Sequence, residues 1–285
     1  MGQPLWFQNR QAVIATMHQK EAVITPLLTE ALGCSTVVPP RFNTDTLGTF
    51  TREIERQGSQ LDAARAKARA ALEITGETLA IASEGSFGPH PQLPWVAANS
   101  ELVLLLDLHH GFEVHATQIS LDTNYAQRQV ATLDEAVAFA DQVLFPSHGL
   151  VLSSSAHPDA ARVKGIQSWD VLKQVFARMK AMAPTGQVHI ETDMRAMHNP
   201  SRMQVIHQAT EQLIQKLQQT CPVCNTPGFS VIEIIAGLPC QWCSTPTSLP
   251  LHEVLGCQRC DHQVTRTPPQ GPALADPGSC PVCNP

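Results

Sequence analysis

The sequence predicts an α/β core with a mixed sheet flanked by helices, followed by a small cysteine-rich module. Strand and helix signals alternate over residues 1–219, which is the pattern of an α/β domain. After residue 220 apolar runs shorten, proline, glycine, serine and threonine become more frequent, and Cys-x-x-Cys pairs begin. We therefore expect two domains, with bounds 1–219 and 220–285.

The elements of the core follow from hydrophobic periodicity and from the residues at their ends. Gly33 and Gly76 end the first two helices, and Thr132 with Glu135 has the spacing of a capping box at the start of the third. Two adjacent strands near His110 are expected to form a hairpin, which makes the sheet mixed. The expected strands are 12–15, 36–38, 78–82, 102–107, 112–119, 150–153 and 188–192, and the expected helices are 18–32, 61–75, 133–144, 168–182 and 201–219.

Composition limits the classes of function. Hydrophobic residues make up 43% and charged residues 15% of the 285 residues, so the chain can bury a core. The formal charge of -6 argues against non-specific binding to nucleic acid or to an anionic membrane. No basic segment followed by an apolar run opens the sequence, and no apolar run is long enough to span a bilayer. We expect a soluble, cytoplasmic protein.

Eight of the nine cysteines follow residue 220, and they form four pairs with i, i+3 spacing. Two such pairs can direct four sulfurs at one ion, so the module is expected to be zinc-ribbon-like and to bind two structural zinc ions. Iron in a rubredoxin-like site is the main alternative metal. Gaps of 15, 13 and 19 residues between pairs allow sequential, crossed or nested pairing. The ligands are Cys221, Cys224, Cys240, Cys243, Cys257, Cys260, Cys280 and Cys283.

Charge within the module argues against a nucleic-acid surface. Between residues 221 and 285 the basic residues are Arg259 and Arg266, against four acidic residues, and two tetrathiolate zinc centres would add negative charge. A role in docking a protein partner, or as a lid, is the preferred expectation for the zinc module. His252 and His262 are spare ligand candidates, but they are more simply interpreted as surface residues.

Three segments of the core carry side chains suited to chemistry. Residues 15–21 lead from a strand into a helix, where backbone N–H groups can bind an anion. An alanine-rich helix contains Asp62 and Lys67, and a solvated charged face is the simpler interpretation there. Glu84 follows a predicted strand end and precedes a loop rich in glycine and proline, a position suited to a metal ligand or a base. Later, Glu191, Asp193 and Arg195 alternate along an extended segment, as either a site or an ion-paired cap.

The order of the first three segments resembles the inosine triphosphate pyrophosphatase superfamily. The similarity lies in residues 15–21, Thr49-Phe50, residues 62–68 and residues 82–86, and it covers about residues 12–120. The resemblance implies that Glu84 and Asp62 hold Mg²⁺ and that Thr16, Lys20 and Lys67 face a triphosphate. The sequence departs from that family in having His18 where asparagine is usual and Ser83-Glu84 where two aspartates are usual. The whole chain also resembles a bacterial domain family of unknown function with Leu-Gly-Thr-Phe and Ala-Ser-Glu-Gly-Ser-Phe-Gly-Pro-His-Pro signatures.

Together these patterns favour a Mg²⁺-dependent nucleotide or phosphoester hydrolase, such as a nucleotide pyrophosphatase, with a structural zinc module. The alternative is a non-enzymatic adaptor whose core binds a small anion and whose zinc module docks a partner. The expected catalytic residues are Glu84, Asp62 and Asp193. The expected substrate-binding residues are Thr16, His18, Lys20, Lys67, Gly85, His90 and Arg195.

Overall fold

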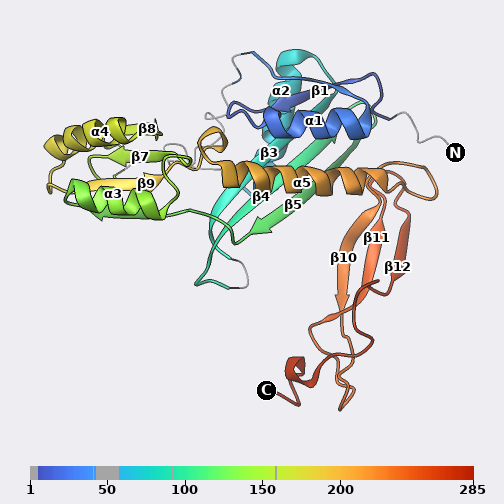
Figure 1. Cartoon of the computed structure of the whole chain (residues 1–285). Coiled ribbons are helices and arrows are strands. Elements are labelled where there is room, and N and C mark those ends of the chain that lie inside the picture. The colour runs from blue at the N-terminus through green and yellow to red at the C-terminus, as the bar shows by residue number, and fades with distance from the viewer. Residues whose placement is uncertain (1–5, 41, 43–57, 91–92, 158) are drawn as a thin grey trace. The chain divides into compact units, whose positions relative to one another are not determined.

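The computed structural model describes residues 6–40, 42, 58–90, 93–157 and 159–285 (Figure 1). It divides into two compact units. The larger holds residues 5–110 and 115–214, and the smaller consists mainly of residues 215–285 together with 111–114. Each unit is described by itself below.

A five-stranded mixed sheet forms the first half of the larger unit, with the strand order β2-β1-β3-β4-β5. Strand β1 pairs in parallel with β2 and β3, whereas β3 pairs with β4 in an antiparallel ladder of eleven residue pairs. The parallel and antiparallel pairings confirm the predicted mixed sheet. The strands are β1 (Gln11–Ala15), β2 (Ser35–Val37), β3 (Leu79–Pro89), β4 (Ala97–Asp107) and β5 (Phe112–Ser120).

Three helices accompany this sheet, namely α1 (Glu21–Leu32), α2 (Gln60–Thr75) and α5 (Pro200–Gln218). Helix α2 packs its alanines against alternate residues of β1, β3 and β4. Helix α5 contacts β4 and β5 through hydrogen bonds from Arg202 and Gln212, and it runs along the sheet in Figure 1. In the described ranges, no helix combines the length and the apolar character needed to cross a membrane.

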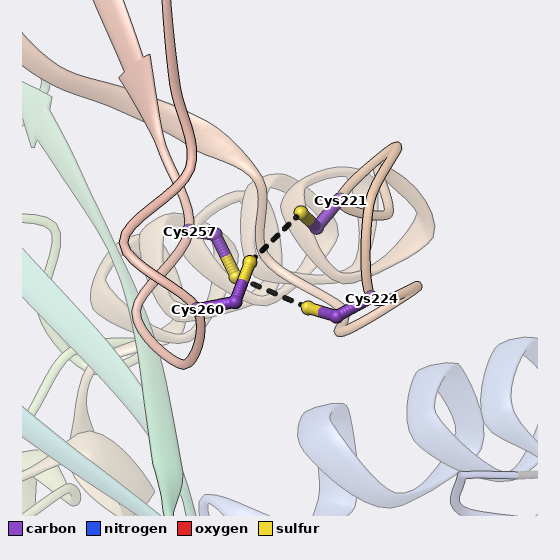
Figure 2. A group of neighbouring side chains, drawn as sticks. All are labelled: Cys221, Cys224, Cys257 and Cys260. Atoms are coloured by element: carbon purple, nitrogen blue, oxygen red, sulfur yellow. Dashed lines mark hydrogen bonds between the residues drawn. The ribbon is translucent and has the colours of Figure 1, made fainter.

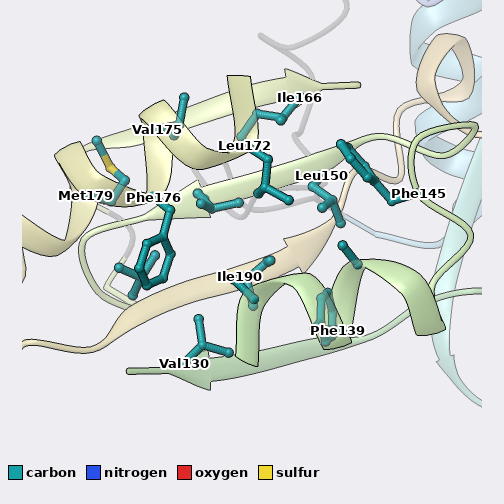
Figure 3. Packing of buried hydrophobic residues seen from close by; sticks show 14 of the residues in the cluster. Val130, Phe139, Phe145, Leu150, Ile166, Leu172, Val175, Phe176, Met179 and Ile190 are labelled. Atoms are coloured by element: carbon teal, nitrogen blue, oxygen red, sulfur yellow. The ribbon is translucent and has the colours of Figure 1, made fainter. Parts of the chain in front are cut away.

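A second sheet of four antiparallel strands completes the larger unit, in the order β6-β9-β7-β8. Its strands are β6 (Gln127–Val130), β7 (Leu150–Ser153), β8 (Arg162–Ile166) and β9 (Val188–Thr192), and helices α3 (Leu133–Gln142) and α4 (Trp169–Met182) pack on it. Figure 3 shows their side chains meeting in one core. Thr132 and Glu135 form the predicted capping box of α3. The short helix η2 (Ala196–His198) follows β9.

The structure corrects two sequence expectations. Strand β3 does not end before Glu84 but continues to Pro89, because its ladder with β4 extends through this stretch and glycine is compatible with it. Strands β6 and β8 were not predicted, because both are short and mostly polar, with few buried side chains to produce an alternating pattern. The second sheet was therefore not separated from the first.

The smaller unit contains a three-stranded antiparallel sheet in the order β10-β11-β12. The strands are β10 (Ser230–Ala236), β11 (Pro250–Gly256) and β12 (Gln263–Arg266), and the short helix η3 (Pro277–Ser279) comes near the end of the chain. Few large apolar side chains are buried here, chiefly Leu238, Val254 and Leu255. This sheet has little apolar core of its own.

The core of the four-stranded sheet gives a stability test. Leu172 on α4 is fully buried, whereas its neighbour Val171 is 42% exposed. We expect Leu172→Ala to lower the free energy of unfolding by about 2–5 kcal/mol, because it leaves a cavity that the packed strands cannot close. Val171→Ala should change it by less than about 0.5 kcal/mol. Urea denaturation followed by circular dichroism measures both, and equal effects would contradict this description of the core.

Candidate functional site

The topology of the three-stranded sheet determines which cysteine pairs meet. Strand β10 leads away from the first pair and ends before the second, and the antiparallel strand β11 returns to the third pair. The first and third pairs therefore lie at one end of the hairpin, while the second pair lies at the other end. The fourth pair joins the second through the parallel bridge between Cys240 and Ala275. With a rise of about 3.3 Å per residue, the seven residues of β10 hold the two ends about 20 Å apart.

Two groups of four cysteines result, and each could hold one metal ion. The pairing is crossed, which is one of the arrangements that the sequence left open. In the first group the sulfurs of Cys221 and Cys260 are 3.6 Å apart, and so are those of Cys224 and Cys257 (Figure 2). The groups are Cys221, Cys224, Cys257 and Cys260, and Cys240, Cys243, Cys280 and Cys283.

The sulfur separations match the edges of a metal tetrahedron. In the second group the Sγ atoms of Cys243 and Cys280 lie 3.6 Å apart, and those of Cys240 and Cys283 lie 3.9 Å apart. A tetrahedron with zinc–sulfur bonds of about 2.3 Å has edges of about 3.8 Å, whereas a disulfide joins its sulfurs at about 2.0 Å. All eight cysteines are free thiols. The donor set and its spacing therefore fit a tetrahedral ion.

The cysteine loops repeat one backbone conformation. In three of the four, the residue after the second cysteine has a positive φ angle, and it is Asn225, Ser244 or Asp261. These short polar residues tolerate the left-handed region better than most others do. In the first, second and fourth loops, the N–H of the residue after the second cysteine donates to the carbonyl of the first at 2.9 Å. Such a turn directs both sulfurs toward the same point.

Threonine hydroxyls lower the pKa of one thiol in each group. The hydrogen bond to Thr226 lowers the pKa of Cys224 to about 6, and the bond to Thr245 lowers that of Cys243 to about 6. The hydrogen bond from the neighbouring sulfur of Cys243 raises the pKa of Cys283 to about 12. A bound cation would remove this difference, because metal ligands bind as thiolates.

A second candidate site lies in the larger unit, beyond the end of β1. Ala15 pairs with Ala82, and after this point β3 continues with only β4 beside it among the described strands. Strand alternation directs Ser83 and Gly85 to one face and Glu84 to the other. The loop from β1 to α1 brings Thr16 and Lys20 to this edge, and both are buried. The structure thus gathers the first and third predicted segments.

Three carboxylates near this edge are each paired with a cation. Lys67 of α2 forms an ion pair with Glu84. Arg202 donates from Nε to Glu101 Oε1 at 2.7 Å, and both side chains are fully buried. Arg195 contacts both carboxylate oxygens of Asp193. Burial opposes ionisation of Asp193, but the hydrogen bonds from Arg195 hold its pKa below the usual range. Glu191 does not join them and lies 3.7 Å from His189 instead.

Lys20 differs from these cations. Its Nζ donates to the Oγ and the backbone oxygen of Ser83, at 2.9 and 3.2 Å, and within the described part of the chain it meets no carboxylate at ion-pair distance. Burial, followed by the positive charge of Arg202, lowers the pKa of Lys20 to about 7. Burial and then Lys20, Arg202, Arg195 and Lys67 lower the pKa of His18 to about 3. The charges that act on His18 are all positive, whereas those that act on Lys20 have both signs, because Arg202 and Lys67 lower its pKa and Glu101 and Glu84 raise it.

Other predicted residues lie elsewhere or have other contacts. Asp62 forms a capping box with Ser59 at the start of α2 and pairs with Arg65, and its side chain is 54% exposed. His90 lies at the end of the β3–β4 hairpin, where its Nδ1 accepts from the N–H of Leu93. The Thr49-Phe50 motif lies outside the described residues.

Arg202 and Glu101 are part of this cluster but were not predicted. Glu101 comes immediately before the apolar run 102–106, so a carboxylate attached to a buried strand was a signal that could have found it. Arg202 had no comparable signal, because an arginine near a helix start is usually solvated. The pair also explains Gly85, where an added Cβ would lie 2.4 Å from both Arg202 Nη2 and Glu101 Oε1.

Gly85→Ala tests this packing. We expect the methyl group to displace the buried pair and to lower the free energy of unfolding by about 1–3 kcal/mol. Gly88→Ala, three residues further along β3, is the matched control, because an added Cβ there meets nothing within 4 Å. Chemical denaturation of the two variants should separate them clearly, and an equal loss would mean that the close approach at Gly85 is not present in solution.

Comparison with known proteins places the chain in a family. No curated protein matches its sequence. The similarity to inosine triphosphate pyrophosphatases is not confirmed by the family match, which begins only at Lys67. The model of a family described as a domain of unknown function (DUF6671) matches residues 67–285, which include both cysteine groups, Glu84, Glu101 and Arg202. The chain belongs to this DUF6671 family.

Proposed function

We propose that this protein binds a small phosphate-like anion at the edge of its five-stranded sheet and carries two structural zinc ions in its cysteine module. The observation that supports anion binding is the buried Lys20, which lies among other cations and has only Ser83 as a hydrogen-bond partner in the described residues. A buried ammonium without a counter-ion is costly. A bound anion would offset that cost.

Neighbouring residues support the same ligand class. Ser83 and Gly85 lie two positions apart on one face of β3, where Lys20 contacts the first and Arg202 packs over the second. Arg202 is paired with Glu101, so Lys20 is the cation that would donate to an oxygen of a phosphate or sulfate group here. His18 is neutral at pH 7 because of its low pKa, so it can donate a hydrogen bond without adding a buried charge.

The carboxylate pairs favour anion binding over Mg²⁺-dependent hydrolysis. A magnesium site needs carboxylate oxygens directed at the ion. Here Glu84, Glu101 and Asp193 face lysine or arginine side chains instead. Hydrolysis of a nucleotide is therefore the second candidate, and the two are separated by experiment below.

Zinc is the proposed metal because thiolate tetrahedra suit it and because a closed set of four sulfurs leaves no position for a substrate. Zinc coordination would also supply the stability that the small apolar core of this module lacks. The ions would fix both ends of the β10–β11 hairpin.

Double variants test the crossed pairing and the metal content together. The parent should contain two equivalents of zinc by elemental analysis. Cys221→Ser with Cys257→Ser removes two ligands from one group and should leave one equivalent, whereas Cys221→Ser with Cys240→Ser damages both groups and should leave none. Sequential pairing predicts the reverse result for the two doubles. Iron in place of zinc, or fewer than two ions in the parent, would contradict the proposal.

Lys20→Met tests the anion site. We expect sulfate to raise the melting temperature of the parent, and its affinity to fall at least about tenfold in the variant, as the loss of a charged hydrogen bond implies. Without sulfate the variant should be more stable than the parent at pH 6, because a buried ammonium ion is replaced by an apolar chain. Lys173→Met, at an exposed position of α4, should change neither property.

The pH dependence has a definite sign. The pKa of Lys20 lies at about 7 in the folded protein against 10.5 as its ordinary value, so the folded state loses this proton first as the pH rises. Sulfate keeps its charge from pH 6 to 9, so its affinity should fall above about pH 7, by up to about tenfold per pH unit. The free protein should gain stability over the same range. A pH-independent affinity would contradict the role of Lys20.

A nucleotide panel with Mg²⁺ separates binding from catalysis. Thermal stabilisation by phosphate-containing ligands without turnover supports the binding proposal. Turnover that depends on Mg²⁺ and is lost in Glu84→Gln would support the hydrolase instead. If neither stabilisation nor turnover is seen, the proposed anion site is wrong.

A further inference from the structure

Strand β10 is an open edge of the three-stranded sheet. It pairs with β11 on one side, and no strand in the described part of the chain pairs with its other side. No backbone hydrogen bond outside this ladder involves Val231–Ala236 among the described residues. Such an edge presents N–H and C=O groups to which another extended chain can bind.

The same strand exposes an unusual amount of apolar surface. The exposed fractions are 50% for Ile232 and 60% for Ile234, and 38% for both Val231 and Ile235. Val231 pairs with Leu255 and Ile234 pairs with Glu253, so both lie on one face of the sheet. Ile235 pairs with His252 and lies on the other face. Natural edge strands are usually protected by charge, proline, β-bulges or a covering element. The ladder of β10 with β11 shifts register between Val231 and Glu233 and between Ile235 and Ala236, so backbone pairing by a partner is expected over the regular stretch 233–235. Glu233 is the only charged residue of β10.

The charge of the module indicates the kind of partner. Across residues 221–285, two arginines stand against four carboxylates, and each tetrathiolate zinc centre would add two negative charges. Pairing of β10 with β10 of a second copy would bring two such acidic modules together, with Glu233 on both strands. Like charges in facing strands are destabilising. A basic partner avoids this repulsion.

We propose that β10 is a docking edge for an extended segment of a partner protein in which apolar and basic residues alternate. The segment adds to the sheet as a fourth strand, next to β10. Backbone hydrogen bonds supply the affinity, and alternate apolar side chains contact Val231 and Ile234, which lie on one face of β10. Its lysines or arginines face the acidic groups of the module, including Glu233. This proposal goes beyond the anion site and does not depend on it.

A model peptide tests the proposal on the full zinc-loaded chain. The probe is a fluorescently labelled peptide of about seven residues with alternating lysine and valine, the usual strand length. Fluorescence anisotropy should show saturable binding that weakens as salt is raised, because exposed charges are screened. The same peptide with glutamate in place of lysine should bind at least about tenfold more weakly. Alternate N–H groups of an added strand point toward β10, and the others point away from it. N-methylation of the first set should therefore abolish binding, whereas N-methylation of the second set should not.

Matched variants locate the binding to β10. Ile234→Lys should weaken binding of the lysine peptide at least tenfold, since it adds a like charge to the edge. Ile74→Lys is the control, because Ile74 on α2 is 59% exposed and lies outside the zinc module. Metal content and circular dichroism should match the parent in both. The proposal is wrong if the lysine and glutamate peptides bind equally or if neither binds at millimolar concentration. It is also wrong if Ile74→Lys weakens binding of the lysine peptide as Ile234→Lys does. Sedimentation experiments test the remaining alternative. If the parent dimerises and Ile234→Lys abolishes the dimer, the edge binds a second copy of the chain and the proposal is wrong.

Discussion

The buried pair of Glu101 and Arg202 is the interaction on which the larger unit depends. It joins β4 of the five-stranded sheet to α5, which follows the last strand of the four-stranded sheet. Arg202 also donates to the backbone oxygen of Met194, just after β9. A buried ion pair adds little net stability, because desolvation offsets most of the attraction. Its effect here is to fix position, since removing either partner would leave an uncompensated charge.

That position creates the surroundings of the proposed anion site. Once Glu101 is committed to Arg202 and Glu84 to Lys67, no described carboxylate remains at ion-pair distance from Lys20. The lowered pKa of Lys20 follows from burial beside Arg202. Gly85 is part of the same arrangement, because the buried pair occupies the space that a side chain would need. The surroundings of Lys20 thus depend on how these side chains pack as well as on which residues are present.

The smaller unit is organised by a different constraint. Its sheet buries few large apolar residues, and a group of four cysteines that could hold a metal ion lies at each end of β10 and β11. An antiparallel hairpin has to bring the segment before its first strand next to the segment after its second strand. Crossed pairing of the cysteines follows directly from this rule. The same thin sheet leaves the apolar residues of β10 exposed, since no described element covers its outer edge.

The sequence by itself determined the mixed α/β class, most elements of the core and all eight cysteines of the metal groups. These features depend on local patterns, namely hydrophobic period, helix caps and the i, i+3 spacing of ligands. Local patterns also indicated the strand-to-helix junction with Thr16 and Lys20, and Glu84 near glycines, as candidate sites. The resemblance to the pyrophosphatase superfamily grouped them with Lys67 and with Asp62, which the structure places at the exposed start of α2. The tertiary structure decided what depends on contacts distant in sequence. It set the crossed pairing, the second sheet and the continuation of β3 past Glu84, and it placed Glu101 against Arg202 across 101 residues of chain. No local sequence pattern predicts these contacts, because each depends on which strands and helices pack together.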